Sequence, residues 1–192
     1  DIYDVIHAAS TKPFGFTPYF PGPGLGGHCL PIDPIYLSWK AKQVGVKSDF
    51  IELAAQTNRS VPGQVVTRLI EVLREIGQDL EQKKILVLGL SYKKNIDDAR
   101  ESPSYEILNL LKMKGARIDY SDPYFEVFPE TRKYDFDLKN VEINERNLKS
   151  YDAVILATDH DDFDIGLIQN KSKILIDTRG VCDKTLTNVV RL

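Results

Sequence analysis

The 192-residue sequence has only two cysteines, Cys29 and Cys182, which are too few for a disulfide framework. No apolar run reaches the length that crosses a bilayer, and no signal-peptide pattern is recognised. No basic run stands out and the formal net charge is −3, so nothing predicts a nucleic-acid partner. These absences favour a globular protein of the reducing cytoplasm, without a membrane or nucleic-acid partner.

The composition that remains is ordinary for a domain with a buried core, with 42% hydrophobic and 28% charged residues. The opening residues, Asp1 to Ile6, have the pattern of a helix interior without a capping signal. The sole methionine is Met113. We therefore expect this chain to be a piece of a longer protein.

The first 80 residues are predicted to be mainly helical. Apolar spacing predicts a helix over 1–9, a second from Pro34 to near Gly45 and a third over 49–76. Pro62 either kinks this third helix or starts another. Residues 10–33 read as a loop rich in proline, glycine and aromatic residues.

From about residue 81, short apolar runs alternate with helical segments. The runs predict strands at 84–89, 116–120, 153–157 and 173–177, and the spacing between them predicts helices at 103–115, 147–150 and 164–169. Residues 134–143 are ambiguous. The alternation predicts an α/β protein in which a helical segment is followed by a doubly wound, Rossmann-like parallel-sheet domain.

Residues 22–27, Gly-Pro-Gly-Leu-Gly-Gly, match the dinucleotide fingerprint G-x-G-x-x-G, but the context is wrong. The fingerprint must follow a strand and open a helix, whereas this run follows Pro18–Pro21 and precedes His28–Pro31. Two interpretations remain open. The run is a flexible turn, or it is a backbone that can approach a substrate closely beside a thiol.

Cys29 lies in this loop, about one turn before the helix predicted to start near Pro34. A helix N-terminus favours the reactive thiolate form, although a lone cysteine is more often a small buried hydrophobe. Asp33 can hydrogen-bond a water or an oxyanion nearby. A pairing of the thiol with His28 is disfavoured because adjacent side chains usually point apart. No second cluster completes a metal site, and none is predicted.

The loop from Gly24 to Asp33, Gly-Leu-Gly-Gly-His-Cys-Leu-Pro-Ile-Asp, resembles the active-site loop of the UDP-glucose/GDP-mannose dehydrogenase family. That family's pattern is a glycine-rich turn, a cysteine, a proline two residues later and an aspartate four residues after the cysteine. Some members carry lysine where this chain has Ile32. The form found here resembles the branch that oxidises UDP-N-acetylhexosamines. The resemblance extends from about residue 10 to the end.

A second stretch supports the resemblance, with Tyr92-Lys93 after the first predicted strand and Arg100 before the next helix. In the family, the aromatic–lysine pair helps bind the UDP-sugar, and the arginine reaches the NAD pyrophosphate. Arg179 matches a frequently basic position near the nucleotide, although a surface arginine in a turn is an equal alternative. The residues that the resemblance assigns to the substrate are Tyr19, Gly24, Gly26, Gly27, Tyr92, Lys93 and Arg179.

The resemblance implies a four-electron oxidation of the sugar C6 alcohol to the acid, with two NAD reduced, in polysaccharide biosynthesis. Cys29 would be the nucleophile that forms a thiohemiacetal and then a thioester, and Asp33 would position water. Residues 1–80 would be part of a central helical dimerisation domain that carries the cysteine loop. Residues 81–192 would bind the UDP-sugar. The family's NAD-binding domain precedes this region, and a homodimer would form through the helices at 49–77.

Three alternatives stay open at this point. The substrate could be UDP-glucose. The chain alone could be a nucleotide-sugar-binding and dimerisation module without activity. It could also be a doubly wound binding domain with no enzymology, which leaves the Cys29 loop unexplained. Residues 159–162, Asp-His-Asp-Asp, are interpreted as a polar loop, and Cys182 as structural.

Overall fold

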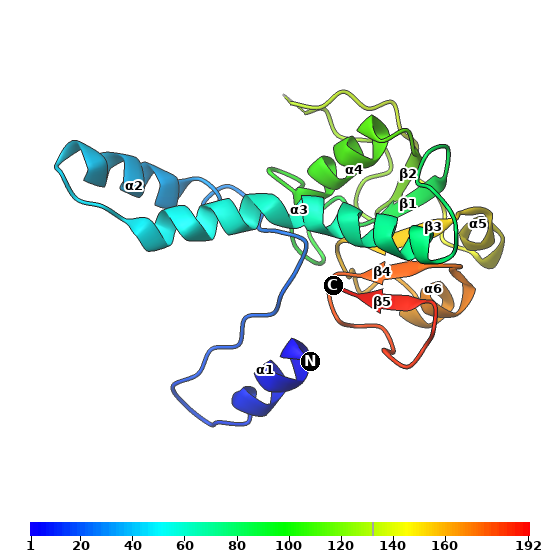
Figure 1. Ribbon diagram of the computed structural model, residues 1–192, viewed down its shortest axis with the longest axis horizontal. Coiled ribbons are helices and arrows are strands. Elements are labelled where there is room, and N and C mark those ends of the chain that lie inside the picture. Colours follow the sequence, from blue (N-terminus) through cyan, green and yellow to red (C-terminus); the bar gives the residue numbers. More distant parts are fainter. Residues whose placement is uncertain (132) are drawn as a thin grey trace.

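Five parallel strands form the centre of the α/β domain, in the spatial order β2-β1-β3-β4-β5 (Figure 1). The computed structural model describes residues 1–131 and 133–192. The strands are β1 (Lys84–Leu88), β2 (Arg117–Ser121), β3 (Ala153–Leu156), β4 (Leu175–Asp177) and β5 (Val189–Arg191). The predicted doubly wound α/β class is confirmed.

Each predicted helix is present within a few residues of its expected bounds. The helices are α1 (Ile2–Ser10), α2 (Asp33–Gln43), α3 (Asp49–Glu75), α4 (Pro103–Met113), α5 (Glu145–Ser150) and α6 (Ile165–Lys171). Local chemistry explains where they start. Ser102 caps α4 by accepting the Ser104 amide at 3.3 Å, and Pro103 fills the first helical position, where no donor is needed.

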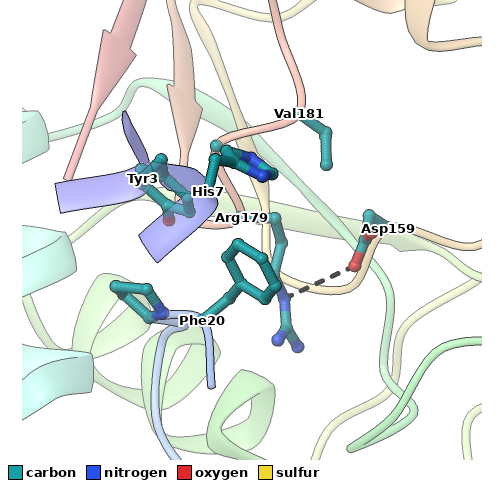
Figure 2. Close-up of a pocket in the computed structure, with 8 residues that line it drawn as sticks. Tyr3, His7, Phe20, Asp159, Arg179 and Val181 are labelled. Atoms are coloured by element: carbon teal, nitrogen blue, oxygen red, sulfur yellow. Dashed lines mark ion pairs between the residues drawn. The ribbon is translucent and has the colours of Figure 1, made fainter. Parts of the chain in front are cut away.

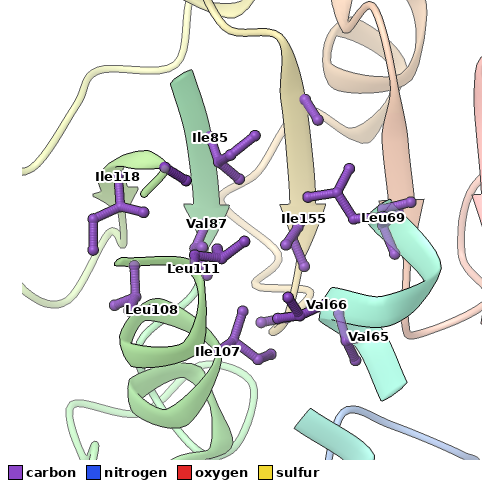
Figure 3. Packing of buried hydrophobic residues seen from close by; sticks show 14 of the residues in the cluster. Val65, Val66, Leu69, Ile85, Val87, Ile107, Leu108, Leu111, Ile118 and Ile155 are labelled. Carbon is purple, nitrogen blue, oxygen red and sulfur yellow. The ribbon is translucent and has the colours of Figure 1, made fainter. Parts of the chain in front are cut away.

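The sheet is apolar on both faces, as a parallel sheet covered by helices requires. On one face, Ile85 and Val87 of β1 pack with α3 and α4 in the larger core cluster (Figure 3). On the other face, Leu86 and Leu88 join the cluster that holds Leu148 of α5. Each of these strand residues is fully buried, which stabilises the fold by about 1.5–3 kcal/mol per side chain.

Helix α3 is continuous through Pro62, so the alternative that a second helix starts there is wrong. Its second half is part of the core, where Val65, Val66 and Leu69 face the sheet (Figure 3). Its first half packs with α2 and extends away from the sheet (Figure 1). The helix therefore links the helical segment to the α/β domain without a hinge loop.

Strand β5 was not predicted, because three residues are too short for a periodicity to be seen. It pairs with β4 and ends the sheet. Residues 134–143 contain only isolated bridges, from Lys139 to Val127 and from Asn140 to Tyr120. Within the described residues, no helix combines the length and the apolar character needed to span a bilayer.

Helix α1 packs against the C-terminal part of the α/β domain. Asp1 pairs with Arg191 of β5 at 3.1 Å, and the Tyr3 hydroxyl donates to the Thr178 carbonyl at 3.3 Å. Gly180 is required at this contact, because a Cβ there would collide with the Tyr3 ring. These contacts place the first residues of the chain beside the carboxyl edge of the sheet.

Candidate active site

The carboxyl edge of the sheet contains a topological switch point between β1 and β3, where ligands of doubly wound proteins bind. The segments that follow three strands meet here. The Thr158 hydroxyl, after β3, donates to the Ser91 carbonyl, after β1, at 2.6 Å. Arg179, after β4, donates from Nε to the Ala157 carbonyl at 2.7 Å. Residues predicted from separate motifs therefore share one edge.

The glycine-rich loop docks onto this edge through Gly26 and Gly27. The Gly27 amide donates to the Arg100 carbonyl at 2.8 Å. A Cβ on Gly26 would lie 2.5 Å from the Cβ of Tyr92 and 2.8 Å from the Glu101 carbonyl, and Gly27 has a φ of +88°. Gly26 has no room for a side chain, and Gly27 has a backbone angle that favours glycine, so together they let the loop lie directly on Tyr92.

A second anchor of the loop is Asn58, in the first half of α3. Its Oδ1 accepts the Leu25 amide at 2.7 Å. Pro62 lies four residues further along the helix, and because proline has no N–H, it cannot donate to the Asn58 carbonyl. The helix thus presents polar groups to the loop at this turn. Sequence analysis missed Asn58, since a polar residue on an amphipathic helix normally faces solvent.

Cys29 is a free, exposed thiol at the end of the loop. Its carbonyl accepts the Ile32 amide at 3.1 Å and the Asp33 amide at 2.8 Å, and this turn leads into α2. The thiol therefore lies one turn before a helix, as predicted. Asp33 is exposed in the first turn of α2. His28 does not point away as expected, because its Nδ1 lies 3.7 Å from the Cys29 Sγ.

Two of the residues predicted to bind the nucleotide or NAD, Tyr92 and Arg100, contact the docked glycines. Tyr92 is half-buried beneath them, and Lys93 is exposed. Arg100 is exposed and pairs with Asp98 through two nitrogens, with Nη2 2.6 Å from Oδ2. The hydrogen bonds from Arg100 lower the pKa of Asp98, and the same pair raises the pKa of Arg100.

A cavity of about 270 Å³ opens at the ends of β3 and β4, and Arg179 lies in its wall between Phe20 and Asp159 (Figure 2). Its side chain is 21% exposed, and its Nε lies 3.7 Å from Asp159 Oδ1. Burial lowers the pKa of the guanidinium, and the Asp159 carboxylate opposes this shift. The full lining comprises Tyr3, His7, Phe20, Pro21, Asp159, Arg179, Gly180 and Val181.

The glycine-rich loop also borders this cavity. A Cβ on Gly22 would lie 2.8 Å from Nη1 of Arg179. Tyr19 is 81% exposed and is not among the cavity residues, whereas its neighbour Phe20 is. The cavity aromatics Tyr3, His7 and Phe20 carried no motif, so sequence reasoning gave them no role. One loop thus runs from Arg179 to Tyr92 and ends at Cys29.

Residues 159–162 form a loop, as predicted, but His160 is not a solvated member of it. The His160 side chain is fully buried, with Nε2 3.2 Å from Oδ2 of the buried Asp122. Burial raises the pKa of Asp122, but the contact with His160 and backbone N–H donors outweigh burial and lower it overall. Among the described residues, no three His, Cys, Asp or Glu side chains are grouped to hold a metal.

Comparisons with known proteins agree with this geometry. Residues 86–184 match the UDP-binding domain of the UDP-glucose/GDP-mannose dehydrogenase family, and residues 1–60 match its central domain. The fold and the site together define the class of protein, a doubly wound domain with cationic side chains at its switch point. The chain belongs to the UDP-glucose/GDP-mannose dehydrogenase family.

Relatives with curated functions match nearly the whole chain. The UDP-N-acetyl-D-mannosamine dehydrogenase of Methanococcus maripaludis is 30% identical over 97% of this chain and 42% of its own length. The UDP-N-acetyl-D-glucosamine 6-dehydrogenase of Salmonella typhi is 29% identical over 85% of this chain and 37% of its own. The chain thus spans about two fifths of these relatives. Both names belong to the branch that the form of the loop predicted.

Solved structures give the same picture. The UDP-D-ManNAc dehydrogenase of Pyrococcus horikoshii superposes with a TM-score of 0.79 at 27% identity, over 99% of this chain and 43% of that one. A UDP-glucose dehydrogenase of Pyrobaculum islandicum superposes with a TM-score of 0.77 at 26% identity, over 100% of this chain and 43% of that one. The fold therefore does not separate the two substrates.

Proposed function

We propose that this chain provides the nucleotide-sugar site and the catalytic thiol of an NAD-dependent dehydrogenase, which oxidises C6 of a UDP-N-acetylhexosamine to the acid. The observation that carries the proposal is the docking of the Cys29 loop over Tyr92, at the switch point of a UDP-binding domain. A thiol that served only packing would be buried, and Cys29 is exposed.

Different residues at the carboxyl edge of the sheet would bind different parts of the proposed substrate. Tyr92 and Lys93 would bind the nucleotide, because an aromatic side chain and an ammonium suit a base and a phosphate. The partly desolvated guanidinium of Arg179 would add a second cation for the diphosphate, where low solvent access strengthens the attraction. The backbone at Gly24, Gly26 and Gly27 would contact the sugar and bring C6 to Cys29.

The chemistry assigned to this chain is covalent. The Cys29 thiolate would add to the C6 aldehyde, forming a carbon–sulfur bond that holds the carbon in place as a thiohemiacetal. After oxidation to the thioester, water would add at the same carbon and the thiolate would leave, releasing the acid. Asp33, on the first turn of α2, would orient that water and take up its proton.

NAD, when bound, would accept one hydride in each of the two oxidation steps. The residue of this chain that fits NAD is Arg100, whose guanidinium is exposed and whose carbonyl binds the Gly27 amide next to the thiol loop. A thiol nucleophile also has to stay reduced. We therefore place the protein in the reducing cytoplasm.

The test combines product yield with nucleotide binding. The full-length protein that carries this chain should reduce two NAD per sugar with UDP-N-acetylglucosamine or UDP-N-acetylmannosamine, and less rapidly with UDP-glucose. In the 192-residue chain, Arg179→Ala should weaken UDP binding about 30-fold in calorimetry, because a charge-assisted contact in a partly desolvated site is lost.

Arg146→Ala is the matched control for Arg179. It removes an exposed arginine from α5, which precedes β3 and so lies near the opposite edge of the sheet. UDP affinity should stay within about twofold of the wild-type value. Equal losses of UDP affinity in both variants would show that the effect is one of net charge. An absence of NADH formation by the full-length protein with every UDP-sugar would contradict the dehydrogenase assignment.

We propose further that a second copy of the chain covers α2 and the first half of α3. Large apolar side chains are exposed there, including Trp39 at 58%, Leu53 at 59% and Phe50 at 89%. Large apolar side chains exposed on two packed helices are typical of protein–protein contacts.

Phe50→Asp should therefore shift the chain from dimer to monomer in sedimentation equilibrium at micromolar concentration, since it places a charge in an apolar contact. Val127→Asp changes another exposed apolar residue, in the α/β domain, and should leave the dimer intact. A wild-type chain that sediments as a monomer would contradict the assignment.

A further inference from the structure

The buried pair Asp122–His160 lies directly beneath the loop that carries Tyr92 and Lys93. Asp122 follows β2 and His160 follows β3, so the pair joins the segments on both sides of β1. Both side chains are fully buried. A histidine and a carboxylate removed from water in this way require specific partners, and most of those partners belong to the β1 loop.

Asp122 fixes the first residues of that loop. Its Oδ2 accepts the Leu90 amide at 2.6 Å and the Ser91 amide at 3.1 Å. Its Oδ1 accepts the Tyr124 amide at 2.8 Å, so both oxygens are engaged. The carboxylate therefore determines where the chain leaves β1, immediately before Tyr92.

His160 fixes the other end of the same short segment. Its Nδ1 accepts the Asn95 amide at 3.0 Å, so this nitrogen carries no proton in that bond. Asn95 has a φ of +60°, in the left-handed region that few residues adopt without support. The Asn95 side chain also donates from Nδ2 to Asp161 Oδ2 at 2.6 Å, and its Oδ1 accepts the Asp161 amide at 2.9 Å. Tyr92 and Lys93 thus lie between two anchored ends.

We infer that Asp122 and His160 are positioning residues for nucleotide binding, because they hold residues 91–95 in the conformation that presents Tyr92 and Lys93. The inference rests on the proposed function, in which these two side chains contact the nucleotide. Neither buried side chain needs to touch the ligand. The loop is shaped before the ligand arrives, so binding does not have to order it, which improves affinity.

The test uses His160 variants of the 192-residue chain, with UDP as the probe. His160→Ala leaves the Asn95 amide without its acceptor and should raise amide hydrogen exchange over 91–98 about tenfold. UDP affinity measured by calorimetry should fall about tenfold, because binding would then have to order residues 91–95. His160→Asn places an oxygen near the former Nδ1 and should recover most of both quantities.

Leu148→Ala is the control for lost stability alone. Leu148 is buried in the core cluster on the face of the sheet that packs against α5, and no residue of the β1 loop belongs to that cluster. Its variant should lower the melting temperature as His160→Ala does, yet keep UDP affinity and the exchange of 91–98 unchanged.

Two outcomes separate this inference from the proposed function. Wild-type exchange and affinity in His160→Ala, or equal losses in Leu148→Ala, would overturn the positioning role. A wild-type chain that does not bind UDP would instead overturn the proposed nucleotide site, and the exchange data would still decide whether His160 orders the loop. If His160→Ala does not fold, Asp122→Asn is measured in its place and is expected to lose exchange protection at Leu90 and Ser91.

Discussion

Cys29→Ser in the full-length protein should lower the rate of acid formation by at least about a thousandfold. The serine hydroxyl is far less acidic than the thiol, so it adds poorly to the C6 aldehyde and no thioester forms. UDP binding should stay within about twofold, because the exposed thiol does not hold the nucleotide in the proposed site. The measurement is the chromatographic yield of acid per NADH.

Cys182→Ala is the matched control for the loss of a thiol. Cys182 is buried, with its amide bound to Asp177 at 2.9 Å, and the proposed mechanism does not use it. This variant should keep the wild-type ratio of two NADH per acid. Acid formation at the wild-type rate by Cys29→Ser would remove the nucleophile from the mechanism while leaving the family assignment untouched.

Alkylation with iodoacetamide at pH 8 should modify Cys29 at least a hundredfold faster than Cys182 in the native chain, as only thiolates react rapidly. Burial, with the Asp177 carboxylate in support, raises the pKa of Cys182 to about 12. Its thiolate fraction at pH 8 is then on the order of one in ten thousand. Cys29 is exposed, so reagent reaches it directly.

Peptide mass spectrometry at timed quenches distinguishes the two sites. Both cysteines should react at similar rates in 6 M guanidinium chloride, which removes the burial of Cys182. Comparable native rates would show that the end of β4 opens readily, and would contradict the interpretation of Cys182 as structural.

The sequence predicted those parts of the molecule that depend on local pattern. Apart from Lys84, which begins the first strand, the runs around Ile85 and Ile155 are apolar at every position, as buried parallel strands require, and both strands are present. The cysteine, its loop and the start of α2 were also predicted from adjacent residues. Strand β5 was missed because its three residues are defined by pairing with β4 rather than by their own pattern.

The contacts that shape the site could not be predicted in this way. Asp122, His160 and Asn95 are separated by up to 65 positions, and only the strand order brings them together. Asn58 contacts the glycine loop across 33 positions, and nothing in its own neighbourhood indicates this. When the partners of a polar residue are distant in sequence, the neighbouring residues alone predict that it is exposed to solvent.

Helix α3 has 27 residues, a length of about 40 Å at 1.5 Å per residue. Val65 and Leu69 fix its rotation about its own axis against the sheet, and Asn58 must then face the Leu25 amide. One residue inserted between Asn58 and Val65 would turn the first half by about 100° and carry Asn58 away from the loop. The helical phase between the thiol loop and the core is therefore fixed, so a change in length here would separate the loop from its anchor.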